Sequence, residues 1–414
     1  MNKIFDLNIL FKYAIFFIFI LLGIFVGLFR QHTSNFGWNG AISLETLSLT
    51  THADLFLNTL IPVFRPFLHI EKELAISCGR SCVETFNAVV WCLAFLAFIF
   101  ILFKNAEHVF LLKNIFNKLA VCSICFGFAI YSIFFSYGTF VDISYALSTT
   151  GLVLIFLNGK NKTYDKTYLT ITLVLVLTFV ANNSRPFFLY IFPIWVLISL
   201  FQKKYAHTAA LIIGGLASAP YHITQFANNG SVTLSNYSGC NFAEVFMSPN
   251  KALIATSLPA NGNSIEYSKY CAMHSKDILR YILDSPINAI SDVFEMRRLL
   301  KIVAPPPFTP YNLEAQNQLW RKCLWVVLII TLYVPLLIIS IKAISRLIYR
   351  KSIDQMLIYL AISMPLIFSV IAHSGWESGR VAMAFYYPLI ILSFKMLADT
   401  NFGGFQYYRT AGKY

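Results

Sequence analysis

The sequence predicts an all-α polytopic membrane protein with about ten transmembrane helices and two long outer loops. Of the 414 residues, 57% are hydrophobic and only 12% are charged, which is too apolar for the surface of a soluble protein of this length. The apolar residues form long blocks, and about 20 of them suffice to cross a bilayer as a helix. Lys and Arg collect in alternate connections between these blocks, as they do in multi-spanning proteins.

The predicted spans, in chain order, are residues 8–29, 86–103, 119–136, 140–157, 168–180, 186–201, 208–225, 323–344, 355–372 and 382–397. No small, alanine-like cleavage site follows residue 29, so the first block is interpreted as a retained span. The short blocks 168–180 and 186–201 flank Asn182-Asn183-Ser184-Arg185. We interpret them as two spans, because a single broken helix would make the total odd and disrupt the charge alternation.

Basic residues in the short connections place both chain ends in the cytoplasm. The basic residues predicted inside are Lys104, Lys113, Lys118, Lys160, Lys162, Lys166, Lys203, Lys204, Lys342, Arg346, Arg350, Lys351, Arg409 and Lys413. The short outer connections hold only Arg185 and Arg380. The net charge of +13 is therefore mainly a topological signal, and nucleic acid is not an expected partner.

This arrangement gives one transmembrane domain over residues 1–400 and a cytoplasmic tail over 401–414. The long segments 30–85 and 226–322 fall outside, which in a bacterial inner membrane means the periplasm or the cell exterior. In 30–85, apolar residues at 56, 60, 63, 64 and 67 predict a helix, either in the membrane interface or packed on the bundle. In 226–322, Ser275 is a possible helix cap, and Ser285-Pro286 predicts a second helix start.

The eight cysteines divide equally between outer loops and spans. An oxidising compartment would allow Cys78–Cys82 and Cys240–Cys271 bridges, although spacing alone does not decide the pairing. A metal site is not expected, because no histidine cluster accompanies these cysteines. The cysteines in predicted spans are interpreted as small packing residues, and they are Cys92, Cys122, Cys125 and Cys323.

Charged residues near the outer membrane edge are the candidates for chemistry, because charges at this depth are costly and are usually paired or functional. They are Asp142, Arg185, Glu377 and Arg380, with Glu45 and Asp54 in the first outer loop. Two guanidinium groups suit a lipid-linked phosphate, and a carboxylate can accept the proton of an attacking hydroxyl. Taken singly, each arginine is more often an interfacial anchor or a structural ion-pair partner.

Several stretches resemble the GT-C fold of membrane glycosyltransferases, the group of the protein mannosyltransferases and aminoarabinose transferases. Asn183-Ser184-Arg185-Pro186 resembles the group's Thr/Ser-Arg-Pro segment at the start of a span. Ala219-Pro220-Tyr221, the stretch 230–235 and Gly239-Cys240-Asn241 resemble its proline-ended span, Gly-x-x-x-x-Ser stretch and Gly-x-Asn turn. Gly379-Arg380 followed by Pro388, with Glu377 in the acidic place, resembles its late element. Their common order extends over residues 1–400.

The resemblance implies an inverting transferase that moves a sugar from a polyprenyl-phosphate donor to a glycan, lipid or protein acceptor, without a metal or other cofactor. The group's base is usually an Asp soon after the first span, but residues 35–40 contain no acid. Glu45 and Asp54 are therefore the candidate bases. Arg185 and Arg380 would bind the lipid phosphate, and the remaining candidate substrate-binding residues are Asp142, His373, Glu377 and Asn241.

Two other functions stay open. A polysaccharide polymerase or ligase also combines many spans with a large outer loop, and it would act on diphosphate-linked glycans. A transporter or flippase of lipid-linked sugars would typically show inverted repeats, broken helices or mid-membrane charges. The sequence shows none of these clearly, since its informative charges lie at one membrane edge.

Overall fold

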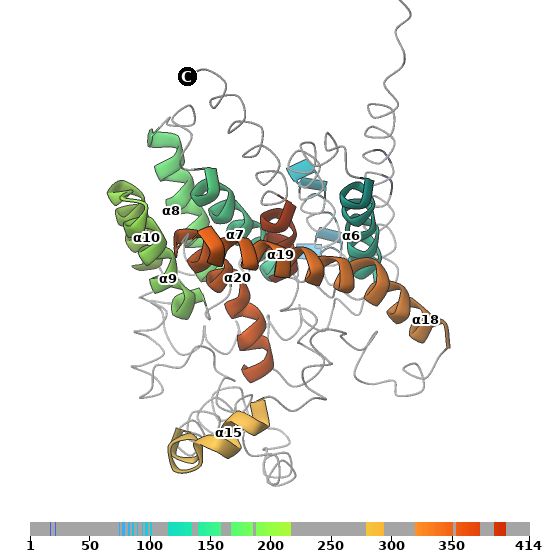
Figure 1. Cartoon of the computed structure of the whole chain (residues 1–414). Coiled ribbons are helices and arrows are strands. Elements are labelled where there is room, and N and C mark those ends of the chain that lie inside the picture. The colour runs from blue at the N-terminus through green and yellow to red at the C-terminus, as the bar shows by residue number, and fades with distance from the viewer. Residues whose placement is uncertain are drawn as a thin grey trace, which may run out of the picture.

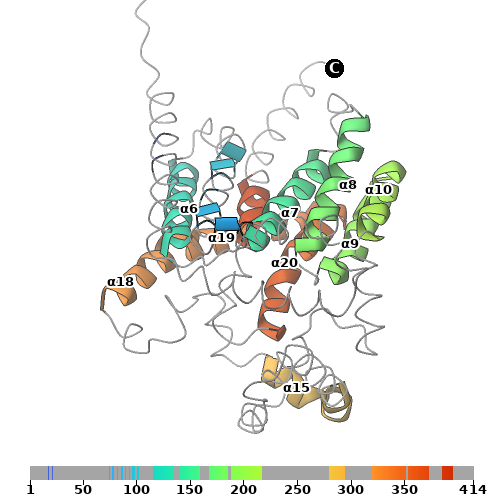
Figure 2. The ribbon, with the colours of Figure 1, turned by 180° about the vertical axis from the view of Figure 1, so that it is seen from behind.

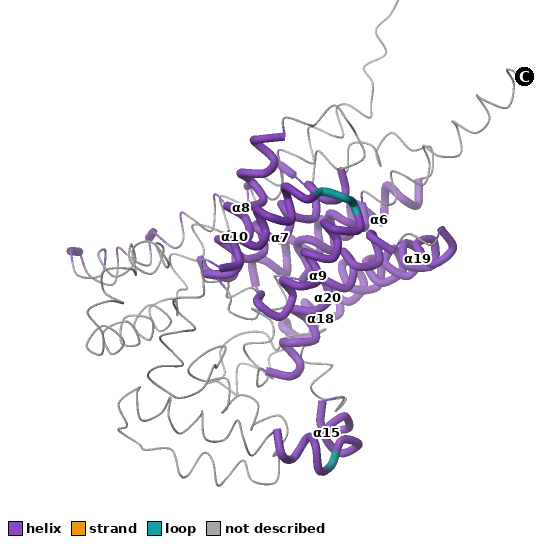
Figure 3. Tube along the Cα trace, turned by 90° about the vertical axis from the view of Figure 1, so that its left-hand side faces the viewer, coloured by secondary structure: helices purple, strands orange, loops and turns teal. Residues whose placement is uncertain are grey.

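The computed structural model describes a helical protein (Figure 1). The described residues are 17 and 21, single positions between 74 and 101, and the ranges 115–134, 140–158, 167–184, 188–216, 279–293, 319–350, 353–372 and 385–394. They contain no strand, and the loops among them are the turn at 202–204 and the junction at Ser285 (Figure 3). The all-α prediction is confirmed for this part of the chain.

The helices follow one another along the chain with short connections where both neighbours are described. Their bounds are α6 Ile115–Phe134, α7 Phe140–Asn158, α8 Thr167–Ser184, α9 Phe188–Phe201, α10 Tyr205–Leu216, α15 Pro286–Val293, α18 Leu319–Leu328, the π-helix η3 Ile329–Tyr333, α19 Val334–Arg350 and α20 Ile353–Ala372. A further short helix covers Phe385–Phe394. Helices α7 to α10 and α20 form one group, and α18 to α19 run from beside α6 towards α20 (Figures 1 and 2).

The core is mainly aliphatic, and its largest fully buried side chains are aromatic residues of α6, α7, α9 and the helix Phe385–Phe394. Phe156 of α7 packs on Trp195 of α9 with ring centroids 5.8 Å apart, and Phe128 of α6 packs edge-on to Tyr387 at 4.8 Å. The Phe156–Trp195 pair is tilted at 35° and the Phe128–Tyr387 pair is edge-to-face at 77°, and aromatic pairs add to the free energy of burial. Helices α8 and α10 approach closely because Gly214 carries no side chain where it meets the Leu175 carbonyl oxygen. Small residues allow the same close contact between helices in membranes.

The π-helix η3 has a local cause. Pro335 has no backbone N–H and cannot donate to the carbonyl of Thr331, four residues earlier. The Ser123 hydroxyl of α6 donates to that carbonyl instead, at 2.9 Å. Gly127 lets α6 approach, since a Cβ there would lie 2.8 Å from Leu332 Cβ and 2.9 Å from its backbone nitrogen. An interhelical hydroxyl thus satisfies a carbonyl that proline leaves without its helical donor, as membrane helices require.

One described helix, Val326–Tyr349, is long and apolar enough to cross a membrane. Its exposed apolar side chains include a row at helical spacing, which comprises Val326, Ile330, Val334, Leu337, Ile341, Ile344 and Ile348. The other apolar helices are shorter within the described residues. The sequence placed this span at 323–344, a few residues earlier, whereas the helical run formed by α18, η3 and α19 extends from Leu319 to Arg350. The count of about ten spans stays a prediction.

Two predictions about the spans were wrong, one about a helix end and one about the burial of a cysteine. Helix α8 continues to Ser184, so Asn182 and Ser184 belong to its last turn and not to the connecting turn. The helix stops there because Pro186 disfavours the helical conformation of Arg185. Cys323, predicted to pack inside a span, is exposed, whereas Cys125 is buried and Cys122 is half-buried. The predicted helix start at Ser285-Pro286 is confirmed by α15.

Candidate functional site

Contacts around Gln202 bring three helix ends together. The Gln202 side-chain amide donates to the Phe156 carbonyl at 3.0 Å and to a carboxylate oxygen of Asp354 at 3.3 Å. Phe156 is near the end of α7, Gln202 follows α9, and Asp354 is in the first turn of α20. The adjoining turn carries Lys203 and Lys204, so this is the end of the bundle predicted to face the cytoplasm.

At the opposite end of the bundle lie the starts of α7 and α9 and the end of α20. The rings of Tyr145, near the start of α7, and Phe188, the first residue of α9, lie 6.0 Å apart. The Asn182 side-chain amide, in the last turn of α8, donates to the Gly215 carbonyl near the end of α10 at 2.7 Å. Helix α20 is antiparallel to α9, so Ala372 lies towards this end as well. We call it the Ser184 end.

The Ser184 end is where the described helices meet the predicted site residues. Asp142 is in the first turn of α7, although only its backbone is described. Arg185 directly follows Ser184, and His373 directly follows Ala372. The side chains of the predicted site residues all lie outside the described ones, and those residues are Glu45, Asp54, Asp142, Arg185, Asn241, His373, Glu377 and Arg380. Their mutual geometry therefore stays a prediction.

The structure adds a residue that sequence reasoning did not select by itself. The Ser184 hydroxyl is buried and has no hydrogen-bond partner among the described residues. An unpartnered buried hydroxyl costs about 1–3 kcal/mol. Trp195 Nε1 and Ser340 Oγ are likewise buried without a hydrogen-bond partner among the described residues, so what distinguishes Ser184 is that Arg185 follows it. Its position beside Arg185 in the Ser-Arg-Pro segment was visible in the sequence. Its burial was not, because the segment was predicted to be a turn.

A row of small polar residues on α7 also lies near this end. Ser148 donates to the Ser144 carbonyl at 2.6 Å, Thr149 to the Tyr145 carbonyl at 3.0 Å and Thr150 to the Ala146 carbonyl at 2.6 Å. Hydroxyls that bond to the preceding turn are satisfied inside an apolar bundle without a partner helix. These donors are committed to the backbone of α7, and we assign them a structural role.

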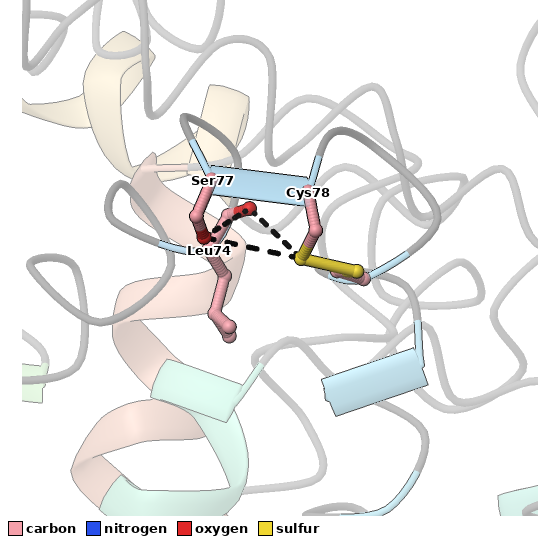
Figure 4. The surroundings of a disulfide bond; sticks show 4 residues. Leu74, Ser77 and Cys78 are labelled. Carbon is pink, nitrogen blue, oxygen red and sulfur yellow. Dashed lines mark hydrogen bonds between the residues drawn. A yellow bond between two sulfur atoms is a disulfide. The ribbon is translucent and has the colours of Figure 1, made fainter.

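The described residues of the segment 30–85 include a disulfide between Cys78 and Cys82, two residues in helical conformation (Figure 4). The Ser77 hydroxyl donates to the Leu74 carbonyl at 3.3 Å, and Cys78 Sγ lies 3.3 Å from the same oxygen. The sequence analysis gave the Cys78–Cys82 bridge as possible, and the structure contains it. Cys240 and Cys271 lie outside the described residues. In the described ranges, no group of three or more His, Cys, Asp or Glu side chains is arranged to hold a metal ion.

Fold and contacts define a helical protein with a segment able to cross a membrane and a polar, partly buried helix end next to a Ser-Arg-Pro sequence. No protein-family profile matches the chain, and no curated protein or solved structure matches it either.

Proposed function

We propose that the chain is a multi-pass membrane glycosyltransferase that transfers a sugar from a polyprenyl-phosphate donor to a glycan, lipid or protein acceptor. In this proposal the reaction takes place at the Ser184 end, which faces the periplasm or exterior of a bacterial inner membrane. The observation that carries the proposal is the buried, unpartnered hydroxyl of Ser184 next to Arg185. A hydroxyl donor and a guanidinium adjacent in sequence suit the oxygens of a lipid phosphate.

The antiparallel order of α7, α8, α9 and α20 supports the same proposal. It brings the helix ends next to Asp142, Arg185 and His373 to one end of the bundle, and Glu377 and Arg380 follow His373 in the chain. Residues separated by more than 200 positions in the sequence would then act on one substrate at the membrane edge. Charged groups at such an edge are usually functional or paired.

The proposed reaction is a single displacement. The acceptor hydroxyl oxygen attacks the anomeric carbon and forms the new glycosidic bond, while the bond from that carbon to the phosphate oxygen breaks. The acceptor proton passes to the carboxylate of Asp54 or Glu45. The polyprenyl phosphate leaves with the bonding electron pair, and Arg185 and Arg380 stabilise its additional negative charge. Attack from the face opposite the phosphate inverts the anomeric configuration.

An in vitro transfer assay with purified protein and radiolabelled polyprenyl-phosphate sugars tests the proposal. We expect transfer or donor hydrolysis that is lost in Arg185→Ala and in one of Asp54→Asn and Glu45→Gln. Arg185→Lys should recover only part of the activity, because an ammonium group cannot reproduce the bidentate contact of a guanidinium. Ser184→Ala should weaken donor binding.

Lys203→Ala is the matched control, since it removes a cation at the opposite end of the bundle. Its activity should equal that of the wild type. Equal losses in Lys203→Ala and Arg185→Ala would contradict the placement of the site, and no turnover of any donor would contradict the transferase proposal itself.

One observation favours a second function, a flippase of lipid-linked sugars. The span Val326–Tyr349 contains the π-helix η3 at Ile329–Tyr333, a local departure from the regular α-helix that the sequence did not reveal. π-helical turns are frequent at functional sites, and interrupted spans are common in transporters. Movement of labelled polyprenyl-phosphate sugar across proteoliposomes, without turnover, would support this function over transfer.

A further inference from the structure

An exposed apolar stripe runs along the outer helical segment 279–293. Four large side chains recur at spacings of three and four residues, and their exposed fractions are 59% for Leu279, 71% for Leu283, 81% for Ile287 and 59% for Ile290. Ser285 lies between two helical stretches, residues 279–284 and α15. Its N–H donates to the Tyr281 carbonyl, and its own carbonyl accepts from the Ala289 N–H, so the helical hydrogen-bond pattern continues through Ser285. The four side chains therefore share one side of a nearly continuous helix.

On its other sides, the segment is either buried within the protein or carries exposed charged residues. Ala289 is buried, and the Tyr281 hydroxyl donates to a carboxylate oxygen of Asp292 at 2.9 Å, which ties the two halves of the segment together. Arg280 and Asp284 form an exposed ion pair at 3.6 Å. The apolar stripe lies between the buried side and the charged side, so the segment is amphipathic.

We propose that the stripe Leu279, Leu283, Ile287 and Ile290 lies in the surface of the lipid bilayer, so that segment 279–293 is an interfacial helix. Its position supports a lipid occupant. The segment lies beyond the Ala372 end of α20 and runs across the direction of that helix (Figures 1 and 2). A helix that crosses the bundle direction beyond its end is oriented as an interfacial helix is, parallel to the membrane plane.

The size of the stripe argues against a protein occupant. Four aliphatic side chains offer roughly a few hundred Å² of apolar surface, whereas a stable protein–protein interface buries about 1,200–2,000 Å² in total. A helix at the bilayer surface needs no such area, because the described helices before and after it in the chain, α10 and the span Val326–Tyr349, are themselves apolar. The inference depends on the membrane placement of the chain and is independent of sugar transfer.

Photolabelling of the full-length protein in phospholipid vesicles tests the inference. One sample contains a phospholipid with a carbene-generating diazirine in its acyl chain near the headgroup, and a second is exposed to water-borne hydroxyl radicals. Peptide mass spectrometry locates both labels. We expect the lipid carbene to label Leu279, Leu283, Ile287 and Ile290, and the hydroxyl radicals to spare them while they modify Tyr281.

Two variants add the same charge on different sides of the segment. Ile287→Asp should reduce lipid labelling of residues 279–290 several-fold, because a carboxylate in the stripe disfavours burial among acyl chains. Asn288→Asp, at the neighbouring exposed polar position, should leave the labelling unchanged. Labelling of the wild-type stripe by hydroxyl radicals instead of lipid would overturn the inference, and so would protection from both reagents, which would indicate a protein partner. Transfer activity does not enter either readout.

Discussion

Gly127→Ala should destabilise the protein, because α6 and η3 are in contact at this position. The added Cβ would lie 2.5 Å from Thr331 Oγ1, 2.8 Å from Leu332 Cβ and 2.9 Å from the Leu332 backbone nitrogen. Real Cβ atoms essentially never approach heavy atoms this closely, and here two of the three contacts belong to the backbone or to the first side-chain atom. The helices would have to separate, which would lengthen the hydrogen bond between Ser123 and the Thr331 carbonyl.

The magnitude follows from two opposing terms. Overpacking of a close helix contact costs about 1–3 kcal/mol, whereas alanine is favoured over glycine in a helix interior by about 1 kcal/mol. The net loss at Gly127 is therefore roughly 0–2 kcal/mol. Gly151→Ala is the matched control, since its Cβ would meet only Leu177 side-chain atoms, the nearest being Cδ1 at 2.7 Å. The Leu177 side chain can rotate away, so this variant should be neutral or slightly stabilised.

Equilibrium unfolding by SDS in mixed micelles, followed by tryptophan fluorescence, measures both variants under the same conditions. Trp195 is buried in the core and reports on its loss. Gly127→Ala should unfold at a lower SDS fraction than Gly151→Ala, by the equivalent of about 1–3 kcal/mol. A Gly151→Ala variant that is as destabilised as Gly127→Ala would refute the reasoning, because the contact atoms would then not decide the outcome.

Three further predictions follow from individual contacts. Ser123→Ala should destabilise the protein by about 1–3 kcal/mol in the same SDS assay, since the Thr331 carbonyl loses its donor; adding Pro335→Ala should recover part of this loss by restoring a backbone N–H, and a purely additive double variant would contradict the assignment. The hydrogen bond to Asp292, with desolvation and repulsion from the carboxylate, raises the pKa of Tyr281. This contact therefore stabilises the segment below the ordinary tyrosine pKa of about 10 and is lost as the pH rises through the raised value. Tyrosinate absorbance of the wild type minus that of Tyr281→Phe should show the raised pKa, and Asp292→Asn should lower it. Cys78 and Cys82 should resist maleimide until a reductant is added, and immediate labelling of either in the oxidised, folded protein would contradict the disulfide.

The sequence allowed us to predict which residues belong to the candidate site, but not which residues they contact. The Ser184-Arg185-Pro186 segment could be recognised directly, and the stop of α8 follows from the effect of Pro186 on the residue before it. The burial of Ser184 could not be predicted, because the segment was interpreted as a short connection between two spans and not as the last turn of a helix. The bond from Asn182 to Gly215 joins residues 33 positions apart, which no local pattern specifies.

Sequence alone determined the helical class, the apolar blocks and the start of α15 at Ser285-Pro286, because each depends on local composition or on the backbone chemistry of proline. Tertiary structure decided which helices meet. Ser123 and Thr331 are 208 residues apart, and both helices are apolar on several sides, so hydropathy does not distinguish the contacting face from the others. In an apolar environment the contacting faces are selected by small residues that allow close approach and by polar groups that need partners. The need for glycine at Gly127 and Gly214, and for a donor to the Thr331 carbonyl, becomes visible only in the folded structure, where the neighbouring helices are present.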